Sequence, residues 1–120
     1  MEERIRFVTH QGHPILFVDF SDCRAVEILR LLPEIQELIT SQPRNSVLAL
    51  GDFSGAEVRR EVADRIKETL VFDRPHIKRS ALVGVDKVPK VFLDSFRTFS
   101  QRELPVFKTR DEAMDWLVKE

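Results

Sequence analysis

Two patterns of hydrophobic residues alternate along the chain, and together they predict an α/β protein. Short runs of apolar side chains on alternate or consecutive positions predict strands at Ile5–Thr9, Ile15–Phe20, Val47–Leu50, Ser80–Val85 and Leu104–Phe107. Longer segments with apolar residues three and four positions apart predict a helix after each strand from the second onward. The predicted order of elements is therefore ββαβαβαβα.

The first two strands are expected to form an antiparallel hairpin, because the link His10–His13 contains Gly12, which suits a tight turn. Ile15–Val18 is apolar on both faces, which is typical of a central strand buried above and below. Strands that are separated by helices are expected to pair in parallel. Pro105 cannot donate a ladder hydrogen bond and places the last strand at an edge. The expected sheet is five-stranded and mostly parallel, with an N-terminal antiparallel hairpin.

Polar residues predict where the helices start and stop. Ser21 or Asp22 is expected to cap the first helix, and Pro33 is expected to kink or divide it. Ser54 and Glu57 have the spacing of a capping box, as do Thr109–Glu112 near the end of the chain. The second and fourth helices are therefore expected to begin at these boxes.

Length and charge indicate one small domain and exclude some partners. The chain of 120 residues, 42% hydrophobic and 32% charged, suits a single domain over 1–120 with one core. Its net charge of −1, with the two signs interspersed, provides no field that attracts nucleic acid. The absence of Tyr and the single Trp also argue against stacking on bases, so no nucleic-acid partner is expected.

Residue types that carry chemistry are sparse. Cys23 is the only cysteine, which excludes an internal disulfide and a thiolate zinc site, and the histidines lack ligand spacing. No glycine-rich phosphate loop or nucleophile elbow appears, so we expect a protein that is not an enzyme and holds no metal or cofactor. The charged start of the chain and the absence of a long apolar run predict no signal peptide, no membrane span and a cytoplasmic location.

Three acids stand at or near the carboxyl ends of predicted strands, where ligands of open α/β sheets usually bind: Asp19, Asp52 and Asp86. Converging carboxylates could hold a metal ion or accept a phosphoryl group, although the spacing does not fit a phosphoacceptor receiver domain. The simpler alternative is that these acids favour the positive ends of the helices that follow.

Two further features are open to a structural and a functional interpretation. Ser54 beside Gly55 could bind an anion or be phosphorylated, but a capping box explains the same serine. Phe92, Phe96 and Phe99 follow each other at helical spacing and are most simply core. Exposure of part of this stripe would indicate a dimer face or a groove for an apolar ligand.

The chain resembles the STAS-like family related to the sporulation anti-anti-sigma factor, which borders on the CRAL-TRIO lipid-binding fold. It is most similar to bacterial members. The segments that carry the resemblance are the hairpin around Gly12, Ile15–Phe20, Gln42–Val47, Lys78–Val85 and Thr109–Leu117. The resemblance covers nearly the whole chain. It implies a STAS-like fold and a domain that works by binding.

The resemblance also implies a candidate switch. In the anti-anti-sigma branch a phosphorylatable serine follows a central strand in an Asp-Ser-(Ser/Thr)-Gly setting. The corresponding stretch is Gly51–Gly55, where Ser54 is the equivalent and the doubled hydroxyl is missing. The leading hypothesis is a non-enzymatic regulatory module that binds a protein partner around Asp52–Gly55. The alternative is a carrier of a small apolar ligand or lipid, held between the sheet and the helix of the phenylalanine stripe.

Overall fold

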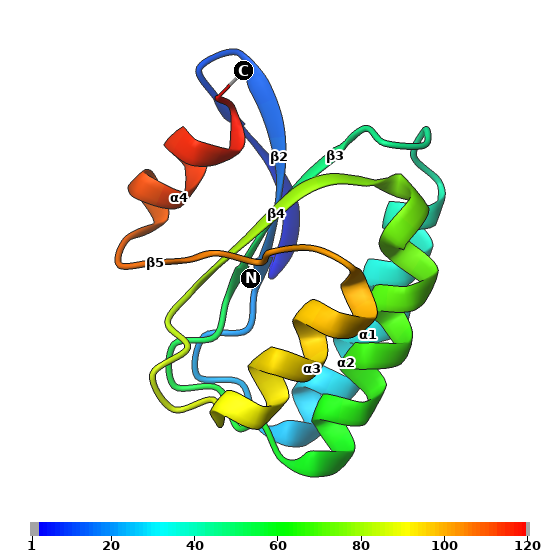
Figure 1. The fold of residues 1–120 in the computed structure, drawn as a ribbon, viewed down its shortest axis with the longest axis vertical. Helices are drawn as coiled ribbons and strands as arrows, with labels where there is room; N and C mark the ends of the chain where they lie inside the picture. The colour runs from blue at the N-terminus through cyan, green and yellow to red at the C-terminus, as the bar shows by residue number, and fades with distance from the viewer. Residues whose placement is uncertain (1–2, 120) are drawn as a thin grey trace.

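The computed structural model describes residues 3–119 and has the predicted α/β architecture (Figure 1). Its elements in chain order are β1 (Ile5–His10), β2 (His13–Asp19), α1 (Ala25–Thr40), β3 (Val47–Asp52), α2 (Arg60–Asp73), a 3₁₀ turn (Arg74–His76), β4 (Ile77–Val83), α3 (Lys90–Ser100), β5 (Val106–Phe107) and α4 (Arg110–Leu117). This order confirms the predicted ββαβαβαβα arrangement.

The sheet has five strands in the order β1-β2-β3-β4-β5. β1 and β2 are antiparallel, and the other neighbouring pairs are parallel, as predicted. Each crossover between parallel strands moves the chain by one strand in the same direction, so the crossover helices α1, α2 and α3 lie on one face of the sheet. Helix α4, which follows the last strand, lies on the other face (Figure 1). β5, which follows Pro105, is the edge strand that the proline predicted.

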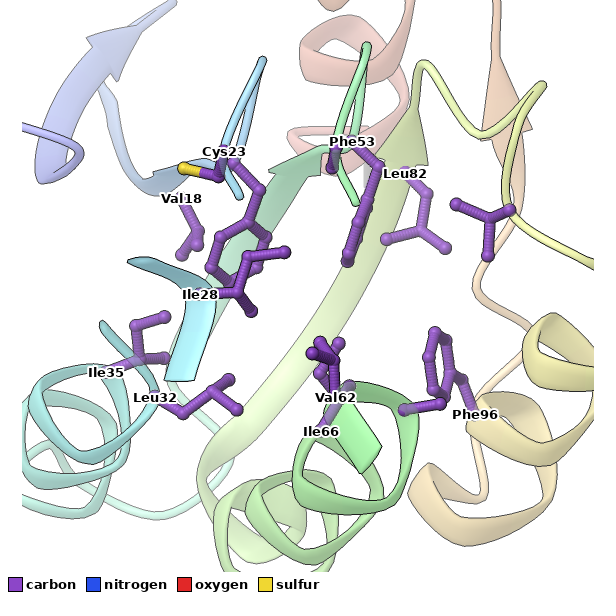
Figure 2. Packing of buried hydrophobic residues seen from close by; sticks show 14 of the residues in the cluster. Val18, Cys23, Ile28, Leu32, Ile35, Phe53, Val62, Ile66, Leu82 and Phe96 are labelled. Atoms are coloured by element: carbon purple, nitrogen blue, oxygen red, sulfur yellow. The ribbon is translucent and has the colours of Figure 1, made fainter. Parts of the chain in front are cut away.

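The core lies in two layers, one on each face of the sheet. Leu16 and Val18 of β2 belong to the larger cluster beneath α1, α2 and α3, part of which Figure 2 shows. Ile15 and Phe17 belong to the smaller cluster beneath α4. Successive side chains of a strand point to opposite faces, so this run of apolar residues reflects burial on both faces, as predicted.

Helix α1 passes through Pro33 without a break, so the prediction of a divided helix is wrong. Pro33 itself is exposed, while Leu32 and Ile35 beside it are buried against the sheet. Burial of an aliphatic side chain contributes about 1.5–3 kcal/mol, and several such anchors offset the hydrogen bond that the proline removes.

The expected caps of α1 are also wrong. Arg24 occupies the N-cap, and its backbone N–H donates to the Glu27 carboxylate at 2.9 Å. Asp22 has a left-handed backbone with φ 57° and lies before the helix. Neither Ser21 nor Asp22 caps the helix, because the chain turns once more between β2 and α1.

The predicted capping box at Ser54 and Glu57 does not form. Helix α2 begins at Arg60, and the Glu57 carboxylate accepts a hydrogen bond from the Ala25 N–H, 2.7 Å away, at the start of α1. The cap at α4 is confirmed, because the Thr109 hydroxyl accepts from the Glu112 N–H at 3.1 Å.

The phenylalanine stripe of α3 does not lie on one buried face. Phe96 is buried and Phe92 partly buried, whereas Phe99 is 43% exposed and Val91 65% exposed. The interpretation of the whole stripe as core is therefore wrong at its outer positions. Within residues 3–119, no helix has both the length and the apolar character needed to cross a membrane.

Candidate functional site

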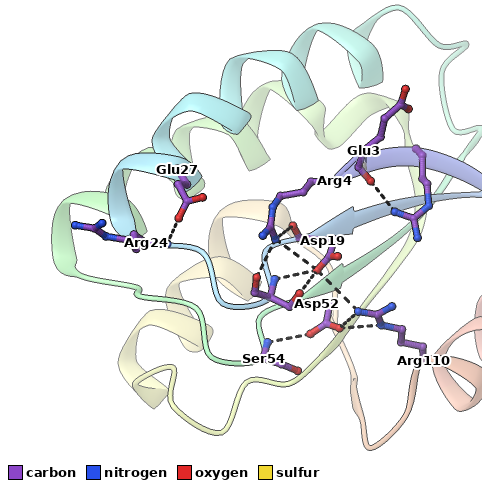
Figure 3. A network of polar contacts seen from close by, with 10 residues as sticks. Glu3, Arg4, Asp19, Arg24, Glu27, Asp52, Ser54 and Arg110 are labelled. Carbon is purple, nitrogen blue, oxygen red and sulfur yellow. Dashed lines mark hydrogen bonds and ion pairs between the residues drawn. The ribbon is translucent and has the colours of Figure 1, made fainter. Parts of the chain in front are cut away.

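Two neighbouring strands end in the same tripeptide, Asp-Phe-Ser. Asp19–Ser21 follows β2 and Asp52–Ser54 follows β3, and the two aspartates are partners in the strand register. In each tripeptide the aspartate carboxylate accepts a hydrogen bond from the serine backbone N–H at 2.9 Å. The two strands therefore end in two equivalent turns that lie side by side (Figure 3).

The phenylalanine of each turn anchors it in the larger core. Phe20 and Phe53 are both buried, and their ring centroids are 5.1 Å apart. Each buried ring contributes about 1.5–3 kcal/mol, and tilted aromatic pairs add about 0.5–1.5 kcal/mol. The two turns are thus anchored on the face of the sheet that α1, α2 and α3 cover.

The carboxylates of the turns lie on the other side and are paired with arginines (Figure 3). Arg110, the first residue of α4, places Nη2 2.6 Å and Nε 2.8 Å from Asp52 Oδ2, and Nη2 3.8 Å from Asp19 Oδ1. Arg4 Nη1 donates to the backbone oxygens of Asp19 and Ser21 at 3.1 and 2.8 Å. Neither aspartate caps a helix, so that interpretation is wrong for both of them.

Asp52 is ionised despite its burial. Burial alone raises the pKa of this carboxyl, but the hydrogen bonds from Ser54 and Arg110 outweigh it and hold the pKa below its ordinary value. The Asp52–Arg110 pair therefore joins the start of α4 to the end of β3, two segments far apart in the sequence. Sequence reasoning missed Arg110, although the repeated Asp-Phe-Ser tripeptide was visible as a signal.

The third candidate acid does not join this cluster. Asp86 is exposed on the loop after β4, and no ion pair links it to Asp19 or Asp52 in the described part of the chain. Within residues 3–119 no group of three or more His, Cys, Asp or Glu side chains is placed to hold a metal ion. Cys23 is buried, and burial raises the pKa of its thiol, so it is not an activated nucleophile.

Three loops meet beyond the carboxyl ends of the strands: residues 20–24 after β2, 53–57 after β3 and 84–86 after β4. We call them the three-loop surface. Backbone hydrogen bonds connect them, from the Asp22 N–H to the Ser54 oxygen at 2.7 Å and from the Glu57 N–H to the Cys23 oxygen at 2.9 Å. The Phe53 N–H also donates to the Val83 oxygen at 3.0 Å.

Two glycines allow these loops to approach so closely. Gly55 and Gly84 have φ angles of 69° and 70°, in the left-handed region that favours glycine. A Cβ on Gly84 would lie 2.1 Å from Ser54 Oγ, and one on Gly55 would lie 2.2 Å from Asp22 Oδ1. Gly55 thus has a structural role that explains it without a ligand.

Ser54 is an exposed residue of the three-loop surface, where its backbone oxygen accepts from the Asp22 N–H and its Oγ lies against Gly84. Its hydroxyl caps no helix, because α2 begins at Arg60. The structure thereby removes the capping explanation that the spacing of Ser54 and Glu57 suggested.

A second candidate site is a cavity of about 110 Å³ between the sheet and helices α1, α2 and α3. Its walls are largely apolar and include Leu32, Ile66 and Leu82 (Figure 2). Of the phenylalanine stripe, Phe96 lines this cavity, and Phe92 and Phe99 do not. A ligand face that includes all three residues stays a prediction.

Phe99 lies instead on the outer surface of the helical layer. The Lys67 ammonium lies 5.1 Å from the centroid of its ring, and Phe72 is exposed on the neighbouring helix α2. A dimer through this face stays a prediction.

Comparisons with protein-family models, with curated proteins and with solved structures find no match to this chain. The site is therefore interpreted from its own geometry.

Proposed function

We propose that this protein is a non-enzymatic regulatory module that binds a protein partner through the three-loop surface and is switched by phosphorylation of Ser54. The observation that carries the proposal is the exposed residue Ser54, which stands on a turn held by Asp52 and caps no helix. The resemblance to the STAS-like family supports the same serine, and the sequence pattern predicts a cytoplasmic location.

The charges around Ser54 explain how a phosphate acts as a switch. The Asp52 carboxylate accepts from the Ser54 N–H, and the Asp22 backbone bonds to the Ser54 oxygen. A phosphate adds about −1.5 to −2 charge beside the exposed Asp22 carboxylate, whereas the charge of Asp52 is already paired with Arg110. The added charge repels a partner that presents acids to the surface, and the unmodified protein binds that partner.

Charge substitution at Ser54 tests the proposal. Ser54→Asp and Ser54→Ala are used as baits for partner capture from a cell extract, and the affinity of each captured partner is then measured with purified proteins. Ser46→Asp is the matched control, because Ser46 is exposed just before the opposite end of the same strand, β3. We expect a partner that binds the wild type, Ser54→Ala and Ser46→Asp equally and binds Ser54→Asp at least about tenfold more weakly. Identical partners and affinities for all four proteins overturn the switch.

The cavity favours a second function, the binding of a small apolar molecule between the sheet and the helices. The observation that carries it is the largely apolar wall contributed by β2 to β4 and all three helices of that layer. Native mass spectrometry of freshly purified protein tests it. A bound mass that organic extraction removes supports ligand binding, and a mass equal to the bare chain in every preparation argues against it.

A further inference from the structure

The cavity between the sheet and helices α1, α2 and α3 has the size of a small ring. Its volume is about 110 Å³. An engineered apolar cavity of about 150 Å³ in another protein binds benzene, so a single ring with few substituents is the largest rigid molecule that suits this space.

One polar side chain in the wall lacks the partner that burial requires. Asp73, the last residue of α2, lines the cavity and is only 3% exposed. Its Oδ1 atom has no hydrogen-bond partner among residues 3–119. Most buried polar atoms in proteins are hydrogen-bonded, and an unpaired one is destabilising, so this oxygen calls for a group that the chain itself does not supply.

A second buried polar atom in the wall also lacks a hydrogen-bond partner. Arg102 also lines the cavity, and its Nε atom is buried without a partner among the described residues. Its Nη2 atom is occupied, because it donates to the backbone oxygens of Arg74 and Ile77. The lining therefore contains one unused acceptor, on Asp73, and one unused donor, on Arg102.

We propose that this cavity binds a ring-sized apolar molecule with one hydroxyl group, which is hydrogen-bonded to Asp73. The proposal rests on the second function given above and names the chemistry of its ligand. A hydroxyl group both donates and accepts, so it can serve the Asp73 carboxyl or the Arg102 N–H. A ligand ammonium or carboxylate would have to be stripped of water in an apolar wall, which is far more costly.

The ionisation of Asp73 is compatible with a hydroxyl. Burial raises the pKa of this carboxyl to about 7, so its protonated and ionised forms are both present near neutral pH. The protonated form donates to a hydroxyl oxygen and the ionised form accepts from a hydroxyl hydrogen.

The experiment compares phenol with toluene, which has a similar shape but no hydrogen-bonding group. Each is titrated into the full chain at neutral pH, and the shifts of backbone amide signals are followed by NMR. We expect saturable binding of both, with phenol about tenfold tighter, because a hydrogen bond to a group of this kind contributes on that scale. The amides that shift should belong to residues lining the cavity.

Two variants assign the preference to Asp73. Asp73→Leu removes the acceptor and is expected to bind toluene more tightly than phenol, because the phenol hydroxyl is then buried without a partner. Thr69→Val is the matched control, because Thr69 is another buried polar residue in the lining, four residues earlier on the same helix. It is expected to keep the tenfold preference for phenol.

The outcomes separate this inference from the function on which it rests. Equal binding of phenol and toluene by the wild type overturns the role of Asp73 but leaves an apolar site. A preference that survives in Asp73→Leu also overturns it. Absence of saturable binding of either compound to the wild type overturns both the ligand chemistry and the site.

Discussion

Two aspartates in this protein are both buried from solvent, but their pKa values shift in opposite directions. Asp52 and Asp73 are each 3% exposed. Asp52 receives hydrogen bonds from Ser54 and Arg110, which lower its pKa against the effect of burial, whereas burial alone raises the pKa of Asp73 to about 7. Burial does not decide the ionisation of a carboxyl by itself, because the donors around it determine whether the charge is retained.

The same contrast separates the two candidate sites. Beside the three-loop surface, the buried charge of Asp52 is paired with Arg110, and Ser54 is exposed. The cavity leaves polar atoms unsatisfied within an apolar wall. Such a wall is incomplete without a small ligand or a buried water molecule.

The largest effect is expected at Asp73, where substitution removes the unpaired carboxyl. The folded protein holds a proton on Asp73 with a pKa of about 7, compared with 3.8 for an unperturbed carboxyl. The folded state therefore binds more protons than the unfolded state between these values, and the free energy of unfolding falls as the pH rises through this window. The rise in pKa corresponds to about 4 kcal/mol in the free energy of unfolding, and most of this stability is lost by pH 8.

Urea unfolding at pH 5 and pH 8 measures this effect. Asp73→Leu should be more stable than the wild type, with a gain that grows towards pH 8 up to about 4 kcal/mol. Asp86→Leu on the exposed loop is the control and should change stability by less than about 0.5 kcal/mol. A gain that is the same at both pH values contradicts the assignment.

The second-largest effect, a loss of stability, is expected at Gly84, which allows the three loops to meet. Gly84→Ala introduces a Cβ within 2.5 Å of the Ser54 backbone nitrogen and requires a left-handed backbone. Left-handed strain and overpacking each cost about 1–3 kcal/mol, so a loss of about 3 kcal/mol is expected in thermal unfolding. Gly12→Ala, also at positive φ but with nothing within 4 Å of its Cβ, is the control and should lose clearly less.

A moderate loss is expected when the charge on Asp52 is removed. Asp52→Asn should destabilise the fold by about 1–2 kcal/mol at pH 7, because Arg110 is partly exposed and the pair is screened in part. The pKa of Asp52 is lowered in the fold, so its contribution is present above the unfolded value and is lost as the pH falls through the folded value.

A double-mutant cycle with Arg110→Ala isolates the pair. The two substitutions should be less than additive at pH 7 and should become additive in acid, where Asp52 is protonated. Additive losses at neutral pH would show that the ion pair does not hold α4 to β3.

The smallest effect is expected at Ser54 itself. Ser54→Ala should change the free energy of unfolding by less than about 0.5 kcal/mol, because the residue is exposed and its backbone N–H still donates to Asp52. Unfolding in urea gives this value directly. A loss above about 1 kcal/mol indicates that the hydroxyl is structural, which weakens the case for a switch.

Much of the fold could be predicted because it depends on local pattern. The run Ile15–Val18 predicted a strand buried on both faces, and the structure places its side chains in two cores. Pro105 predicted an edge strand because a proline has no N–H to donate to a neighbouring strand in any tertiary context. Thr109 predicted a cap because its partner, Glu112, lies within one helical turn.

The candidate sites were predicted less well because their contacts join distant segments. Glu57 has the right spacing to cap its own helix, but the loops bring it to Ala25 instead. The spacing rule failed because a carboxylate binds whichever free N–H the tertiary structure places beside it. The phenylalanine stripe failed in a similar way, because Phe96 is buried in the core between the helices and the sheet, whereas Phe99 lies exposed beside Lys67 of α2.

The sequence by itself determined the order of the elements, the sense of strand pairing and the edge of the sheet. These follow from the period of apolar residues and from backbone chemistry within a few positions. Only the tertiary structure decided that Arg110 neutralises Asp52 and that Asp73 is buried with Oδ1 unpaired. The ionisation of a carboxyl depends on the water and donors within a few ångströms, and for these two aspartates the assembled fold supplies or withholds them.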